Sequence, residues 1–318
     1  MHQTQLGVVS TENAALQKNQ IVYGLLTLVE TLEEKSDQGN SRPKFGLHHA
    51  LTCDRKEQFF ESFLPLATAA NRPRHHFFYL YGGEMQAHKS LFLRCVNRLK
   101  GIDLDHLPSS RSNRQEVADF SITIPYLDNL DHLYSEISRM ILAELGLDDR
   151  EIERLSDNCI VNGLARSSKY SQIGREGKLL FHLSINEGVW HPIKVPSFAL
   201  KFIENFCLKN LSDTSPELFF FFSVEYDDDN QVIQQEIETA LSNSNYMKSL
   251  GELKMVNDRH VEEWFGLYKD VWETTSERKA MKKSYFGDPP FELYMEEVQI
   301  KLKKVIHEIN GEKHDRRS

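Results

Sequence analysis

The sequence predicts an α/β protein in which a parallel β-sheet is covered by helices on both faces, giving three layers. Segments of strand character alternate with segments of helical character from residue 51 to residue 272. The strand segments, such as residues 177–188 and 216–226, are nearly continuous apolar runs. Such runs are typical of strands that are buried on both faces of a parallel sheet with crossover helices.

Five strands are expected, each followed by a helix. The predicted strands are residues 74–83, 119–126, 177–188, 216–226 and 253–257. The predicted helices are residues 51–70, 89–101, 130–147, 195–211, 230–245, 258–272 and 289–311. Leu133, Ile137 and Ile141 recur at helical spacing in the third of these. Asp54 and Asp258 are expected as N-caps of their helices.

The N-terminal part has a different character. Residues 11–34 form an amphipathic pattern, and residues 35–44 are polar with Gly and Pro, which favours a linker. The expected organisation is therefore an N-terminal helix and linker (1–40), an α/β domain (41–275), and a C-terminal helix with a polar tail (276–318). The first helix is either a partner-binding arm or a helix that packs on the main domain.

Composition narrows the class of protein. The chain has 318 residues, is 40% hydrophobic and 27% charged, and carries a net charge of −9. Its pI near 5.8 disfavours nucleic acid as a partner. The four cysteines are widely spaced, and no secretory signal or apolar run long enough to span a membrane is evident. A soluble, cytoplasmic protein is expected.

The segment after the first predicted strand follows the order of a phosphate-binding loop. Gly83 begins it, and Lys89 and Ser90 end it at the start of a helix. In a working loop a glycine precedes the lysine, because the backbone approaches the phosphate closely there. This chain has His88 at that position, and Glu84 adds a negative charge inside the loop. Both features oppose ATP binding.

The second half of a nucleotide site is also altered. An acidic residue at the end of a neighbouring strand normally holds magnesium, but residues 177–188 place Ser184 and Asn186 there. Glu225 and Asp227 follow another strand, either as part of a solvated acidic turn or as a displaced metal site. The pattern predicts a P-loop NTPase-like fold with degenerate Walker A and Walker B motifs, no catalytic residues, no metal and no cofactor. The alternatives are a divergent ATPase or kinase, or a switch that holds ATP and Mg²⁺ through Lys89 and Ser90.

The segments "LTCDRKEQ" (51–58) and "FFYLYGGEMQAHKSLFLRCVNRL" (77–99) resemble the inactive STAND domains, degenerate relatives of signal-transduction ATPases found in bacterial conflict and defence systems. The likeness spans about residues 45–275. It implies a non-catalytic module that binds other proteins, such as an effector or protease of the same system. The implied role is that of an accessory or sensor-adaptor in antiviral defence or signalling, CRISPR-linked or NLR-like.

Other residues have less support as functional sites. The pairs His48-His49 and His75-His76 lack the spacing of a metal site. Cys53 and Cys95 are interpreted as buried apolar residues rather than reactive thiols. Arg111 and Arg114 lie in a polar loop, where contact with a phosphate backbone is the less favoured interpretation. Trp264 and Tyr268 fit either core packing or a partner surface.

Overall fold

A computed structural model shows the three-layer α/β fold. It describes residues 45–53, 55–68, 73–102, 104–105, 116–124, 132–155, 158–171, 173–227, 230–242, 246–272 and 274–311. They belong to one compact unit, Phe45–Ser318. The predicted helix 11–34, its linker, Asp54, Arg111 and Arg114 lie outside the described residues. Among the residues described, no helix combines the length and apolar character that crossing a membrane requires.

The centre is a five-stranded parallel sheet with the strand order β2-β3-β4-β1-β5. The strands are β1 (His75–Gly83), β2 (Val117–Thr123), β3 (Lys178–Asn186), β4 (Glu217–Tyr226) and β5 (Met247–Leu253). The middle strands β1, β3 and β4 are almost wholly buried. The predicted α/β fold and the positions of the first four strands are therefore confirmed.

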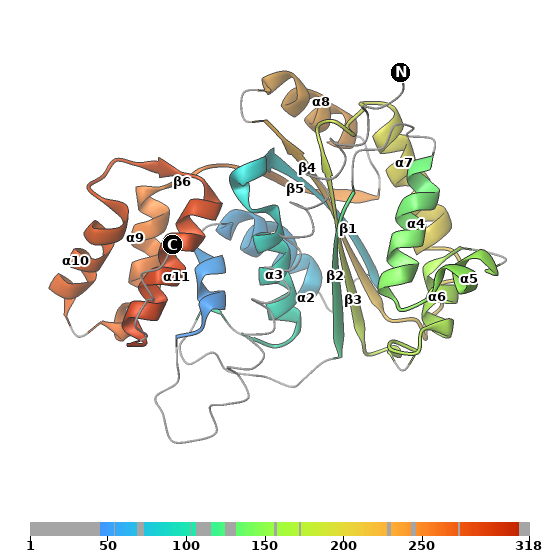
Figure 1. Cartoon of the computed structure of the whole chain (residues 1–318), viewed down its shortest axis with the longest axis horizontal. Coiled ribbons are helices and arrows are strands. Elements are labelled where there is room, and N and C mark those ends of the chain that lie inside the picture. The colour runs from blue at the N-terminus through green and yellow to red at the C-terminus, as the bar shows by residue number, and fades with distance from the viewer. Residues whose placement is uncertain are drawn as a thin grey trace, which may run out of the picture. The chain divides into compact units, whose positions relative to one another are not determined.

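Helices cover both faces of the sheet (Figure 1). One face packs against η2 (Glu57–Phe63), α2 (Leu64–Thr68) and α3 (His88–Leu99). The other packs against α4 (Leu133–Glu144), α5 (Asp149–Glu153), α6 (Ile160–Arg166), α7 (Lys194–Phe202), η5 (Ile203–Cys207) and α8 (Gln231–Ser242). The phosphate-loop segment joins β1 to α3 and thus lies at the carboxyl edge of the sheet, next to the end of β4 and one strand away from the end of β3.

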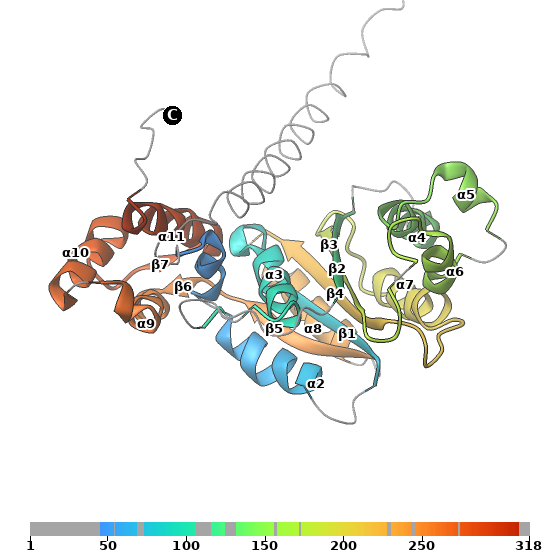
Figure 2. The ribbon, with the colours of Figure 1, turned by 90° about the horizontal axis from the view of Figure 1, so that it is seen from below.

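A third hydrophobic core belongs to what we term the C-terminal helical cluster. Its elements are η1 (Leu47–Thr52), β6 (Val256–Asn257), α9 (Asp258–Leu267), η6 (Lys269–Val271), α10 (Thr275–Phe286), β7 (Glu292–Leu293) and α11 (Met295–Ile309). Figures 1 and 2 show that α3 lies between α9–α11 and the sheet. The predicted domain boundaries at residues 40 and 275 stay predictions.

Three expectations about local structure were wrong. The helix predicted over 51–70 is broken at Arg55, whose left-handed backbone (φ 70°) cannot continue a helix. The fifth strand is Met247–Leu253 instead of 253–257, because this edge strand exposes polar side chains and does not read as an apolar run. The N-cap of α9 is Asn257 rather than Asp258, since its side chain accepts hydrogen bonds from the backbone of Arg259 and His260.

Some helices had no clear sequence signal. The short helices α5 and α6 lie in the stretch 148–177, which reads as polar and mixed. Helix α10 also went unpredicted, because eight of its twelve residues are polar or charged and only Phe286 is buried. Its capping residue, Thr274, accepts a hydrogen bond from the backbone of Glu277.

Candidate functional site

The phosphate-loop segment has the predicted strand–loop–helix form. After β1, Gly83 has an extended backbone (φ −60°, ψ 153°), and residues Glu84–Gln86 form the short helical turn η3. Ala87 then adopts a left-handed conformation (φ 50°, ψ 54°), and α3 begins at His88. A left-handed backbone ordinarily favours glycine, so the strained residue of this loop is an alanine.

The imidazole of His88 is held by the loop and the adjacent strand. Its Nε2 lies 3.2 Å from the carbonyl oxygen of Gly82 and 3.1 Å from that of Gly83, while Nδ1 lies 2.6 Å from the hydroxyl of Ser223 on β4. Carbonyl oxygens only accept hydrogen bonds, so Nε2 carries the proton and Nδ1 accepts from Ser223. The side chain is 2% exposed.

Burial also fixes the charge of this histidine. Loss of water around the ring lowers the pKa of His88 to about 4, and the positive charge of Arg55 acts in the same direction. The bonds to the carbonyl groups of Gly83 and Gly82 oppose the shift. At neutral pH the ring is therefore uncharged, and it offers a polyphosphate no positive charge.

Lys89 and Ser90 follow at the start of α3, but their surroundings differ. Ser90 is buried, and its hydroxyl accepts a hydrogen bond from the side-chain amide of Gln299 on α11. Lys89 is exposed. Neighbouring atoms nevertheless remove part of the water around its ammonium group, which lowers the pKa of Lys89, and the carboxylate of Asp119 on β2 opposes this shift. The hydroxyl that would bind magnesium is thus engaged by the chain's own C-terminal helix.

The end of β3 places no carboxylate beside the loop. Ser184 is buried and its hydroxyl donates to the carboxylate of Glu225 on β4. Asn186 is exposed and is aligned with Glu225 in the parallel pairing. Glu187, just after the strand, accepts hydrogen bonds from the backbone of Asp227 (3.1 Å) and from the side chain of Asn230 (3.2 Å). Glu187 thus holds the connection between β4 and α8 at the end of β3.

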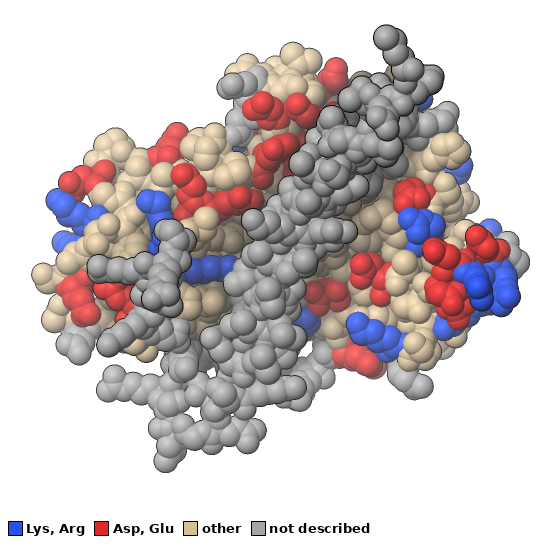
Figure 3. Space-filling view, in the orientation of Figure 1, with Lys and Arg blue, Asp and Glu red and all other residues tan. Residues whose placement is uncertain are grey.

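Glu225 is the acidic group nearest to the loop in the sheet register, because it is aligned with Gly82. Its partial burial raises the pKa of the carboxyl group, and the charges of Glu84 and Glu296 raise it further, whereas the bond from Ser184 lowers it. The loop, β4 and α11 thus each bring a carboxylate to one region. Figure 3 shows Asp and Glu side chains gathered between α11 and α8. Like charges repel one another, so these carboxylates disfavour an anionic ligand in this region.

Arg55 was not singled out as a site residue, yet its guanidinium group contacts the loop. It is 1% exposed and donates to the carbonyl oxygens of Gln86 (2.7 Å) and Lys254 (3.0 Å). Arg55 lies in a polar stretch of the sequence. No local pattern in that stretch predicts its burial or its two acceptors, which are distant along the chain.

The remaining candidate residues contribute to packing and hydrogen bonding within the fold. Within the described parts of the chain, no group of three or more His, Cys, Asp or Glu residues could hold a metal ion. His76 bonds Glu217, and the four cysteines are buried thiols, which confirms the interpretation of Cys53 and Cys95. Trp264 and Tyr268 are buried in the core of the C-terminal helical cluster, which confirms core packing and excludes the alternative of a partner surface.

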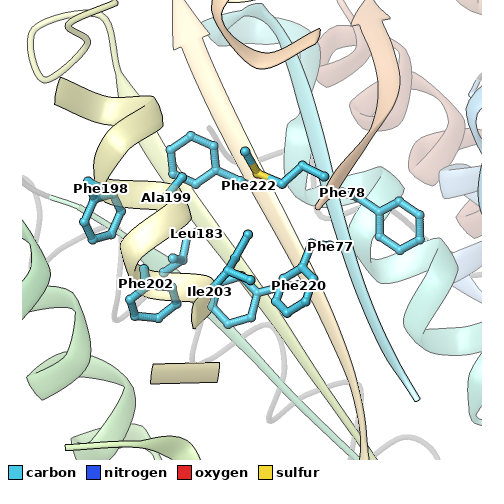
Figure 4. A pocket seen from close by; sticks show the side chains of 10 residues that line it. Phe77, Phe78, Leu183, Phe198, Ala199, Phe202, Ile203, Phe220 and Phe222 are labelled. Atoms are coloured by element: carbon cyan, nitrogen blue, oxygen red, sulfur yellow. The ribbon is translucent and has the colours of Figure 1, made fainter. Parts of the chain in front are cut away.

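A recess lies on the opposite face of the sheet. It lies under α7 and η5 and is lined by apolar side chains, as Figure 4 shows. The lining consists of Phe77, Phe78, Leu183, Phe198, Ala199, Phe202, Ile203, Phe220, Phe222 and Met247. No polar group in this lining could orient a nucleotide or a charged substrate.

Comparisons with known proteins bear on the family. A family model described as inactive STAND matches residues 50–224. Among solved structures, the chain is similar to the ORC2 protein of Aeropyrum pernix in ADPNP–ADP complexes, with 15% identity and a TM-score of 0.36, covering 86% of this chain and 66% of that chain. The ADP form of the same protein gives 13% identity and a TM-score of 0.34, with 86% and 67% covered. The chain therefore spans about two thirds of the length of these structures. No curated protein matches it.

Proposed function

The chain belongs to the inactive STAND family, and from this premise we propose that it is a non-catalytic module that acts by binding other proteins. Its role would be that of an accessory or sensor-adaptor protein in a prokaryotic antiviral defence or signalling system. The partner would be a protein of the same system, such as an effector or a protease. Neither a nucleotide nor a metal is needed for this role.

The observation that carries this proposal is the position of His88. In a phosphate loop the ligand is bound by backbone groups that surround it. Here a neutral imidazole, bonded to two loop carbonyl groups and to Ser223, lies at the position where glycine would let the backbone approach a phosphate. Displacing it would leave a buried hydroxyl without a partner, which costs about 1–3 kcal/mol.

Two further features support the absence of turnover. Magnesium needs oxygen ligands in an octahedral arrangement, and the hydroxyl of Ser90 already accepts a bond from Gln299. The end of β3, where the magnesium-binding acid of an ATPase lies, has Ser184 and Asn186 instead. Glu225 on β4 lies at the same edge of the sheet, but its carboxylate already accepts a hydrogen bond from Ser184.

The direct test is release of inorganic phosphate from ATP with Mg²⁺, measured on the purified chain and on Lys89→Ala. We expect no turnover above the buffer background in either protein. Calorimetric titration with ATP and Mg²⁺ should likewise show no heat of binding. Turnover that disappears in Lys89→Ala would overturn the proposal and would establish a divergent ATPase. Binding heat without product, lost in the same variant, would instead support an ATP-holding switch.

Partner binding needs its own test. Proteins encoded beside this chain in its genome would be co-expressed with the full chain and with a variant that lacks residues 1–40. We expect one of them to co-purify, and we expect the truncated variant to lose it if the N-terminal segment is the recruiting arm. If none of them binds either form of the chain, the proposed role within a shared system is wrong.

A further inference from the structure

The phosphate-loop segment contacts the C-terminal helical cluster as well as the sheet. Helix α11 packs against the loop turn η3 and against η1. Ala87, the left-handed residue of the loop, packs against the cluster's hydrophobic core. Gln299 of α11 donates to Ser90 at the start of α3. One helix of the cluster thus contacts both the loop turn and the start of the helix that follows it.

The chain passes between the sheet and the cluster at two places, and Arg55 connects them. The first passage, between η1 and η2, includes Arg55 itself; the second, between β5 and β6, includes Lys254. The buried guanidinium group of Arg55 donates to the carbonyl oxygen of Lys254 and to that of Gln86 in the loop. A single side chain therefore binds both passages and the loop together.

Two other polar contacts also join the cluster to its surroundings. Lys56 and Glu263 form an ion pair at 2.7 Å, but both side chains are substantially exposed, so its contribution is small. The hydroxyl of Tyr268 donates to the carbonyl oxygen of Leu104 at 2.5 Å. The loop contacts are thus one of the links between the cluster and the sheet.

We propose that the former phosphate loop is a clasp, in which Arg55 and Gln299 take the place of a bound nucleotide and hold the C-terminal helical cluster closed. Opening of this clasp, without nucleotide exchange, is then the step that regulates the module. The inference rests on the proposed function, because it assumes that no nucleotide enters the loop. The chain's own side chains then set the balance between the closed and open states.

The test is hydrogen–deuterium exchange on the full chain and on Gln299→Ala. If the clasp exists, amide exchange should increase about fivefold in α11 and in residues 84–94 together, the factor expected from loss of one neutral hydrogen bond of about 1 kcal/mol. Exchange in β4 should not change. Alanine has the highest helix propensity, so faster exchange in α11 cannot come from a weaker helix. Ile300→Ala, at a position on α11 that is 56% exposed, is the matched control and should change neither segment.

Ser90→Ala removes the same hydrogen bond from the other side and replaces Gln299→Ala if that variant does not fold. The double variant should exchange no faster than either single variant, because all three lack one common bond. Exchange that increases in only one of the two segments, or additively in the double variant, would overturn the clasp. Protection of the loop by ATP and Mg²⁺ would instead contradict the proposed function, while coupled exchange without ATP would still support the clasp.

Discussion

The Nδ1 atom of His88 lies 2.6 Å from the hydroxyl oxygen of Ser223, and both residues are buried at the carboxyl edge of the sheet. This bond joins the loop after β1 to strand β4. It places an uncharged imidazole at the position where the phosphate-binding loop of a nucleotide-binding protein has glycine. The residue that breaks the phosphate-loop pattern is therefore part of the packing of this fold.

The pair predicts a non-additive response to substitution. His88→Phe removes both ring nitrogens and leaves the hydroxyl of Ser223 without its partner, and Ser223→Ala leaves Nδ1 of His88 without its donor. Each single change should lower the free energy of unfolding by about 1–3 kcal/mol. The double variant should lose at least about 1 kcal/mol less than the sum, as measured by urea denaturation. Strict additivity would show that the two side chains do not interact.

The buried histidines predict a loss of stability in acid. The pKa is lowered to about 4 for His88 and to about 3 for His182, mainly by burial, against 6.5 in the unfolded chain. Between pH 6.5 and about 4 the unfolded state therefore binds more protons than the folded state. Each of these histidines should lower the free energy of unfolding by up to about 1.4 kcal/mol per pH unit as the pH falls.

Urea denaturation between pH 7 and pH 4.5 measures this slope. His88→Phe removes one of the titrating groups, so its free energy of unfolding should fall less steeply than that of the unchanged protein. Above pH 6.5 the two proteins should keep a constant difference in stability. Equal slopes in acid would mean that His88 titrates normally in the folded state.

Gly82 lies outside the phosphate-loop motif, yet its substitution should lower the stability of the fold. A Cβ atom on Gly82 would lie 2.7 Å from the backbone carbonyl oxygen of Leu253 on the neighbouring strand β5. Gly82→Ala should therefore separate β1 from β5 and cost about 1–3 kcal/mol of stability. In Gly266, on α9, an added Cβ meets nothing within 4 Å. Gly266→Ala should instead gain about 0.5–1 kcal/mol, which makes it the matched control in thermal denaturation.

The sequence by itself determined the layers of this fold and the position of the altered loop. Buried parallel strands require continuous apolar runs, and helices that cover them require apolar residues at helical spacing, so both leave local patterns. The mismatch at His88 and the absence of an acid at Ser184 and Asn186 are likewise visible in single positions. The edge strand β5 has no such pattern, because it exposes polar side chains and lacks a continuous apolar run.

Only the tertiary structure decided what surrounds the loop. The bond between Gln299 and Ser90 joins residues 209 positions apart, and the bond from Arg55 to Lys254 joins residues 199 positions apart. Neither separation corresponds to a periodic pattern in the sequence, because the side chains meet through the packing of separate elements. A buried arginine and a buried serine find their partners only once the sheet and the C-terminal helical cluster have come together, because burial makes an unpaired polar group costly.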